Sequence, residues 1–167
     1  GTITNNKTLK SYDSTTVENY NLITNASTGT LETNNVFINK KTNAANTDSI
    51  DLSGIIGIVN NSGILLHKNS TYTNNGKIVN LSTGTITNKD SLLLGSTGII
   101  LNSNTITVDS TLTNNGYIIN YSGKTVTVNR EIVNNSILDN AGTITISPSN
   151  GLFKNNLTLN NKSTGTY

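Results

Sequence analysis

The side chains best suited to chemistry are charged groups that recur at intervals of about 20 residues in this 167-residue sequence. Lys89-Asp90, Asp109 and Arg130-Glu131 fall at equivalent places of three successive repeats. Clustered carboxylates beside a basic residue can bind Ca²⁺ or cleave glycosidic bonds. A pocket needs walls, and no long insertion lies beside these residues. We therefore expect a surface patch of alternating charge that prevents mis-stacking, with a bound cation or a glycan-cleaving site as alternatives.

The single histidine is the other candidate for chemistry. A catalytic histidine needs an orienting partner and a nucleophile within reach. His67 lies in the strand-like stretch Ile64–Lys68, at the repeat position of Asn88 and Val108. We expect it at a turn or strand end in a structural role, and we predict no metal, no cofactor and no enzymatic activity.

The composition excludes several classes of protein. The chain has no Cys, which disulfide scaffolds and Cys-based metal sites need. Only 12% of residues are charged, they are scattered along the chain, and the formal net charge is +2. Nothing in this charge distribution favours binding to nucleic acid. The longest weakly polar run, residues 53–59, is far shorter than the roughly 20 residues of a membrane-spanning helix. We expect no membrane insertion.

An internal repeat organises the sequence. Residues 74–87 (NNGKIVNLSTGTIT) and 114–127 (NNGYIINYSGKTVT) are similar, and residues 94–113 form a further copy between them. The unit is therefore about 20 residues long and holds three short β runs separated by Asn, Gly and Ser turns. One unit cannot close a hydrophobic core alone, whereas stacked units can.

This repeat predicts an all-β fold, a parallel β-solenoid of about eight coils with three short strands per coil. We expect one domain over residues 1–167, less regular over 1–52 and regular over 53–167. Strand spacing sets the coils about 4.8 Å apart. An antiparallel sandwich or barrel also has short, regularly spaced strands, but it does not explain why like residues recur every 20 positions.

Alternation along each run predicts which side chains face the core. For the first run these are Phe37, Ile58, Ile78, Ile100, Ile118 and Leu138. For the Thr-x-Thr run they are Leu65, Ile86, Ile106, Val126 and Ile144. For the third run they are Leu31, Tyr72, Leu93, Leu112 and Ile132.

An asparagine ends the first run of most repeats. Stacked asparagine amides can donate and accept between neighbouring coils, which predicts an internal ladder without any binding role. The predicted ladder is Asn39, Asn60, Asn80, Asn102, Asn120 and Asn140.

Two outward surfaces are candidates for binding. The first is an apolar stripe next to the inward residues, either a lateral partner surface or a corner at which both neighbours point inside. The stripe is Ile38, Val59, Val79, Leu101, Ile119 and Leu159. The second is a face of paired threonines in four successive repeats, which suits ice or carbohydrate, although the β propensity of Thr also explains it. These threonines are Thr85, Thr87, Thr105, Thr107, Thr125, Thr127, Thr143 and Thr145.

Both ends of the sequence read as repeat, without an evident cap. Terminal coils of repeat proteins need covering, so we expect either a longer solenoid or pairing with other copies at the ends. The residues expected in this assembly interface are Thr2, Ile3, Thr4, Thr166 and Tyr167.

The segments NNGKIVN, NNGYIIN, STGTITN and AGTITIS resemble the Asn/Gly/Thr-rich repeats of β-helical surface proteins, such as filamentous-haemagglutinin-type adhesins and autotransporter passengers. This resemblance implies an exported, elongated structural or adhesive protein, and it transfers no catalytic residue.

Together these patterns favour an extracellular or cell-surface structural protein. We expect a filament subunit or adhesin shaft that stacks head to tail, with other copies of itself as partners and glycans as a second class. The alternatives are a carbohydrate- or ice-binding solenoid that uses the outward Thr/Asn face, and a polysaccharide-degrading enzyme around Asp90 and Asp109.

Overall fold

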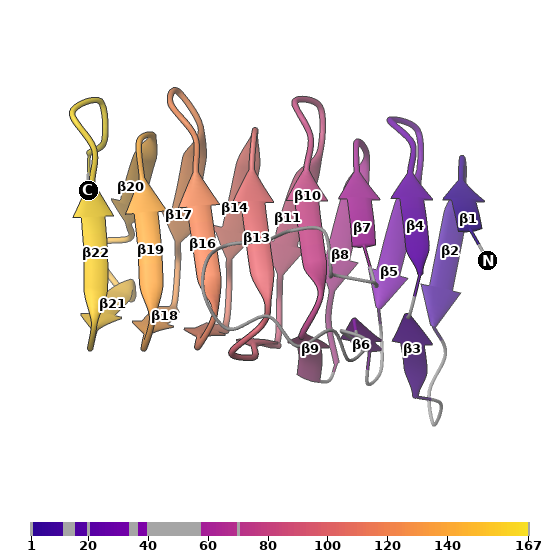
Figure 1. Cartoon of the computed structure of the whole chain (residues 1–167), viewed down its shortest axis with the longest axis horizontal. Helices are drawn as coiled ribbons and strands as arrows, with labels where there is room; N and C mark the ends of the chain where they lie inside the picture. The colour runs from indigo at the N-terminus through magenta and orange to yellow at the C-terminus, as the bar shows by residue number, and fades with distance from the viewer. Residues whose placement is uncertain are drawn as a thin grey trace.

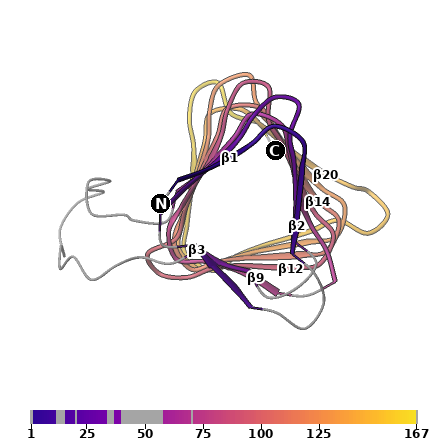
Figure 2. The same ribbon diagram turned by 90° about the vertical axis from the view of Figure 1, so that its right-hand side faces the viewer.

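The chain winds as a parallel β-solenoid. The computed structural model describes residues 2–11, 16–19, 21–33, 37–39, 58–69 and 71–166. These residues form 22 short strands and no helix, and the strands stack side by side along a rod (Figure 1). Viewed along the rod, the coils superimpose as a three-sided ring (Figure 2).

Each side of the ring is one parallel sheet, and every third strand along the chain belongs to the same sheet. The first sheet consists of β1 (Thr2–Asn5), β4 (Leu22–Asn25), β7 (Ile58–Asn61), β10 (Lys77–Asn80), β13 (Ile99–Asn102), β16 (Tyr117–Asn120), β19 (Ile137–Asn140) and β22 (Thr158–Asn161). The second consists of β2 (Thr8–Ser11), β5 (Thr30–Thr33), β8 (Ile64–His67), β11 (Thr85–Asn88), β14 (Thr105–Val108), β17 (Thr125–Val128) and β20 (Thr143–Ile146). The third consists of β3 (Val17–Asn19), β6 (Phe37–Asn39), β9 (Thr71–Asn74), β12 (Ser91–Leu94), β15 (Thr111–Asn114), β18 (Glu131–Asn134) and β21 (Leu152–Asn155).

The predicted fold class is confirmed, because all the pairings between these strands are parallel and like residues stack on like. Thr85, Thr105 and Thr125 lie in one column, for example. The estimate of eight coils is slightly too high. Seven strands in each of the second and third sheets enclose six turns of the spiral, and only the first sheet has an eighth strand.

The core is built by the second and fourth residues of the strands. Most strands alternate between half-buried and buried side chains because successive residues of a strand point to opposite faces. Each full burial of an aliphatic side chain contributes about 1.5–3 kcal/mol, and each internal coil supplies at least two. The buried aliphatic set at the second position includes Ile23, Leu31, Val59, Leu65, Ile78, Ile86, Leu92, Ile100, Ile106, Leu112, Ile118, Val126, Ile132, Leu138 and Ile144.

Three predicted core positions need correction. Val59 rather than Ile58 points inward in β7, and Leu92 rather than Leu93 points inward in β12. Leu31 is buried as expected but belongs to the second sheet, where it pairs with Leu65. The side chain of Phe37 lies outside the described residues. The remaining predicted core positions are buried.

Glycines allow the coils to approach at the corners. A Cβ atom on Gly84 would collide with the carbonyl oxygen of Asn61, and one on Gly116 would collide with that of Gly98. The same glycines precede strands whose first N–H donates to the coil below, as in the bond from Thr85 N–H to the Gly63 carbonyl at 2.8 Å. Gly84 and Gly116, which end an STG and an NNG segment, therefore lie at corners with no room for a side chain.

Candidate functional site

A continuous ladder of asparagine side chains runs along the inner edge of the first sheet. Each Nδ2 donates to the Oδ1 of the asparagine in the next coil, at 2.8–3.0 Å in all seven steps. The members are Asn5, Asn25, Asn61, Asn80, Asn102, Asn120, Asn140 and Asn161. All the donor bonds point toward the C-terminal end of the rod, so the ladder is polar.

The second N–H of each amide joins the side-chain ladder to the backbone. Asn80 Nδ2 also donates to the Thr105 carbonyl at 3.0 Å, and Asn140 Nδ2 to the Thr166 carbonyl at 3.0 Å. The six internal members are completely buried. Because an unpaired buried amide costs about 1–3 kcal/mol per group, each asparagine is satisfied only when the next coil supplies its counterpart.

The predicted ladder contains two errors. Asn60 lies in register with Val79 and is half-buried on the outer face, whereas its neighbour Asn61 occupies the ladder position. Asn39 belongs to β6 of the third sheet and pairs in register with Asn74. Asn80, Asn102, Asn120 and Asn140 lie in the predicted ladder.

A second, interrupted ladder lines the third sheet, and sequence reasoning missed it. Asn114 Nδ2 donates to Asn134 Oδ1 at 2.6 Å, and Asn134 Nδ2 to Asn155 Oδ1 at 2.7 Å. Leu94 occupies the same column between Asn74 and Asn114. The signal was present in the sequence, since an asparagine ends the third run of most repeats.

The outward apolar stripe is shorter than predicted. Val79, Leu101 and Ile119 lie in register on the outer face of β10, β13 and β16, together with Ile99 and Tyr117. Ile99 and Leu101 are buried there, and the other three are half-buried. The other predicted members lie elsewhere: Val59 is buried in the core, Leu159 packs against the core, and Ile38 belongs to the third sheet. We call Val79, Ile99, Leu101, Tyr117 and Ile119 the outer apolar patch.

An acid–phenol pair borders the outer apolar patch. The Tyr117 hydroxyl donates to Asp139 Oδ2 at 2.7 Å. Partial burial and this bond to Asp139 raise the pKa of Tyr117 to about 12. Burial alone would raise the pKa of Asp139, but hydrogen bonds from Tyr117 and Asn160, with the charge of Lys162, hold it below its usual value. The charged Asp139 carboxylate therefore marks the border of the outer apolar patch next to Ile119.

The carboxylates of the predicted charged patch have separate partners. Asp90 accepts a hydrogen bond from the Ser91 backbone N–H at 2.8 Å, and Asp109 accepts one from Asn129 Nδ2 at 2.7 Å. Glu131 pairs with Lys154 at 2.7 Å. Within the part of the chain that the structure describes, no three His, Asp or Glu side chains gather as they would around a metal ion.

His67 is the last residue of β8 and points into the core, in register with Asn88 as predicted. Its Nδ1 lies 2.9 Å from the Thr33 hydroxyl, and its ring centroid lies 5.7 Å from that of Tyr72. Burial raises the pKa of the Tyr72 hydroxyl well above its usual value. The His67 imidazole is thus part of the buried inner face of the second sheet.

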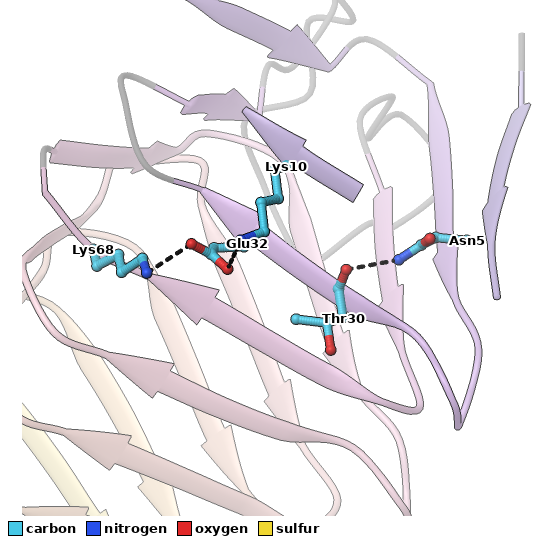
Figure 3. Close-up of polar contacts among 5 residues, drawn as sticks. All are labelled: Asn5, Lys10, Thr30, Glu32 and Lys68. Carbon is cyan, nitrogen blue, oxygen red and sulfur yellow. Dashed lines mark hydrogen bonds and ion pairs between the residues drawn. The ribbon is translucent and has the colours of Figure 1, made fainter. Parts of the chain in front are cut away.

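A buried carboxylate on the second sheet was not anticipated. Glu32 is only 7% exposed, and it pairs with Lys68 at 2.7 Å and with Lys10 at 3.2 Å. Figure 3 shows the two lysines approaching Glu32, and it also shows the hydrogen bond from Asn5 Nδ2 to the Thr30 backbone carbonyl. Lys10 and Glu32 stack in register, so the Glu32 carboxylate has a lysine partner in the coil on either side.

The predicted assembly residues lie at the two edges of the rod. Thr2, Ile3 and Thr4 form β1, the edge strand of the first sheet, and Thr166 pairs with Thr143 beside β20. Tyr167 lies outside the described residues. An apolar cavity of about 120 Å³ lies at the β1 end, where Ile3 and Leu9 meet Ile23 and Leu31. The core is therefore incompletely covered at this edge.

Comparison with known proteins returned nothing similar. No helix in the described ranges has the length and apolar character to cross a membrane. No family model, no curated protein and no solved structure matches the chain.

Proposed function

We propose that this chain is a structural segment of an extracellular fibre or adhesin shaft, and that its solenoid ends stack head to tail on further copies. The observation that carries the proposal is the unbroken first-sheet ladder, which reaches the edge strand at both ends. A scaffold in which every coil satisfies the hydrogen-bonding groups of the next is suited to forming a long fibre that bears load.

The edge asparagines are complementary. At the β22 end, Asn161 Nδ2 donates to the Gly165 carbonyl of its own coil at 2.7 Å. At the β1 end, Asn5 Oδ1 accepts from the Lys7 N–H at 3.3 Å, a long bond. Every internal amide of this ladder both donates to one neighbour and accepts from the other, so a stacked copy would give each edge amide its missing partner.

The proposed junction continues the internal register of the first sheet. Asn160 would lie against Thr4 of the next copy, and Asn161 against Asn5, because these pairs continue the existing columns. The first sheet extends one strand beyond the other two at the β22 end. In-register stacking would therefore pair β22 of one copy directly with β1 of the next, and the test is placed at these two strands.

Cysteine pairs test this junction in a chain that has no native cysteine. In the double variant Thr4→Cys with Asn160→Cys, adjacent parallel strands would place the two Cα atoms about 4.8 Å apart, within the range of a disulfide. We expect filaments by negative-stain microscopy at raised concentration, and a ladder of covalent oligomers on a non-reducing gel after mild oxidation.

The matched control is Thr4→Cys with Thr158→Cys, which moves one thiol two residues along the same face, roughly 6.6 Å. Filaments without a disulfide preference would reject the register but keep head-to-tail stacking. Discrete short rods at every concentration would reject the assembly itself.

A second candidate is a binder of ice or an ordered carbohydrate surface, and the outward face of the second sheet favours it. Thr85, Thr105, Thr125 and Thr143 form one outward column. The companion column, Thr87 to Thr145, is displaced by two residues along the same strands, and Leu66 interrupts it in the next coil. A regular array of hydroxyl and methyl groups suits a repetitive ligand. Thermal hysteresis of the purified chain decides the case for ice.

A further inference from the structure

From β11 onward, the corner between the second and third sheets changes length at one coil. Two residues connect the sheets after β11, β14 and β17, whereas five residues, 147–151, connect β20 to β21. This longer turn projects from the ring beside β20 (Figure 2). The turn is braced, because the Gly151 N–H donates to the Ser147 carbonyl at 2.9 Å and the Ser147 and Ser149 hydroxyls lie 3.2 Å apart.

The longer turn forms one wall of a hollow of about 330 Å³. Its lining residues are Thr111, Arg130, Glu131, Asn150 and Leu152. Thr111, Glu131 and Leu152 are the first residues of three successive strands and lie in one outward column. A hollow of this size falls within the range of small-ligand sites, so the coil repeat has acquired a concave surface here.

The charges of the hollow are unequal. The Glu131 carboxylate is engaged by Lys154 at 2.7 Å. The Arg130 guanidinium has no ion pair or hydrogen bond to any of the residues that the structure describes, although its backbone N–H and carbonyl pair with neighbouring coils. The N–H donors of the Arg130 guanidinium are therefore available to a ligand, whereas the neighbouring Glu131 carboxylate is already neutralised by Lys154.

We propose that this hollow binds a carboxylated sugar, such as a uronate residue of an acidic glycan. A guanidinium matches a carboxylate in planar, two-point geometry. The Thr111 hydroxyl and the Asn150 amide can each donate to and accept from sugar hydroxyls. Leu152, which is 45% exposed, offers an apolar surface to the C–H face of the ring. The site is on the side of the rod and does not depend on end-to-end assembly.

Calorimetric titration of the whole chain with a galacturonate trisaccharide at low salt tests the proposal. Arg130→Gln should weaken binding about tenfold or more, because it removes a charge-assisted pair. Asn150→Ala, in an exposed turn, should weaken it about threefold. The matched control is Lys89→Gln, which removes the same charge from the same corner two coils away and should leave the affinity unchanged.

Three results would overturn the assignment. These are equal weakening by Lys89→Gln and Arg130→Gln, equal binding of a neutral trisaccharide, and no binding of the uronate trisaccharide by the unmodified chain. Circular dichroism of each variant confirms that the solenoid is intact, so that a lost signal reports on the hollow itself.

Discussion

Replacing Ile118 with aspartate is expected to destabilise the solenoid by about 4 kcal/mol or more. Ile118 is 3% exposed and lies in the core between Ile100 and Leu138. The change removes roughly 1.5–3 kcal/mol of apolar burial and places an unpaired carboxylate where no described cation faces it, which is among the largest single-residue penalties. For a chain of this length we expect a melting temperature lower by roughly 8–16 °C.

The matched control is the adjacent residue. Ile119 lies one position along β16 and faces outward in the outer apolar patch, so Ile119→Asp should cost much less, about 1 kcal/mol. Thermal melting by circular dichroism measures both. Equal melting temperatures for the two variants would contradict the inward and outward assignment of β16.

Hydrogen exchange adds a spatial test of the same variant. Each coil of a solenoid contacts only its neighbours, so stability is close to a sum of coil and interface terms. Ile118→Asp should therefore accelerate amide exchange most in β13, β16 and β19, and least in β1 and β4. A uniform loss of protection along the whole rod would show that the coils unfold as one unit.

The three-sided parallel spiral could be predicted from the sequence because stacking converts sequence period into spatial contact. Where the period is close to 20, as from β10 to β19, the predicted core residues Ile78, Ile100, Ile118 and Leu138 are the buried ones. The strand pairings follow from the same period, since residues one repeat apart become neighbours across a sheet.

The errors arise where two neighbouring residues satisfy the same pattern. Asn60 and Asn61 both end an apolar run, and a shift of one residue exchanges the inner and outer faces of a strand. Pairing of β7 with β4 and β10 places Asn61 inside, which required the three-dimensional register. Leu92 and Leu93 present the same ambiguity in β12.

Contacts between residues that are not one repeat apart could not be predicted from the sequence either. Glu32 meets Lys10, 22 residues earlier, and Lys68, 36 residues later, and no single period connects the three. The hollow beside Arg130 depends on three extra residues in one turn. Such departures from the repeat are where this scaffold gains specific chemistry, because the regular coils present the same flat faces throughout.

The asparagine pair supplies the second large prediction. Asn61→Ala should destabilise the chain by about 2–4 kcal/mol, because it leaves buried groups without partners. Asn61 Nδ2 donates to Asn80 Oδ1 at 3.0 Å and to the Thr85 carbonyl at 2.9 Å, and its Oδ1 accepts from Asn25 Nδ2 at 2.8 Å. Urea unfolding followed by circular dichroism measures the loss.

Asn60→Ala makes the same chemical change one residue earlier and on the outer face, so it should alter the free energy of unfolding by no more than about 0.5 kcal/mol. The contrast isolates the ladder from the general value of an asparagine side chain. If the two variants were equally stable, the hydrogen bonds between the asparagine side chains of the first sheet would contribute no more to stability than hydrogen bonds to water do. The stiffness of the rod would then have to come from the backbone pairing and the aliphatic core alone, and end-to-end stacking through Asn161 and Asn5 would lose its physical basis.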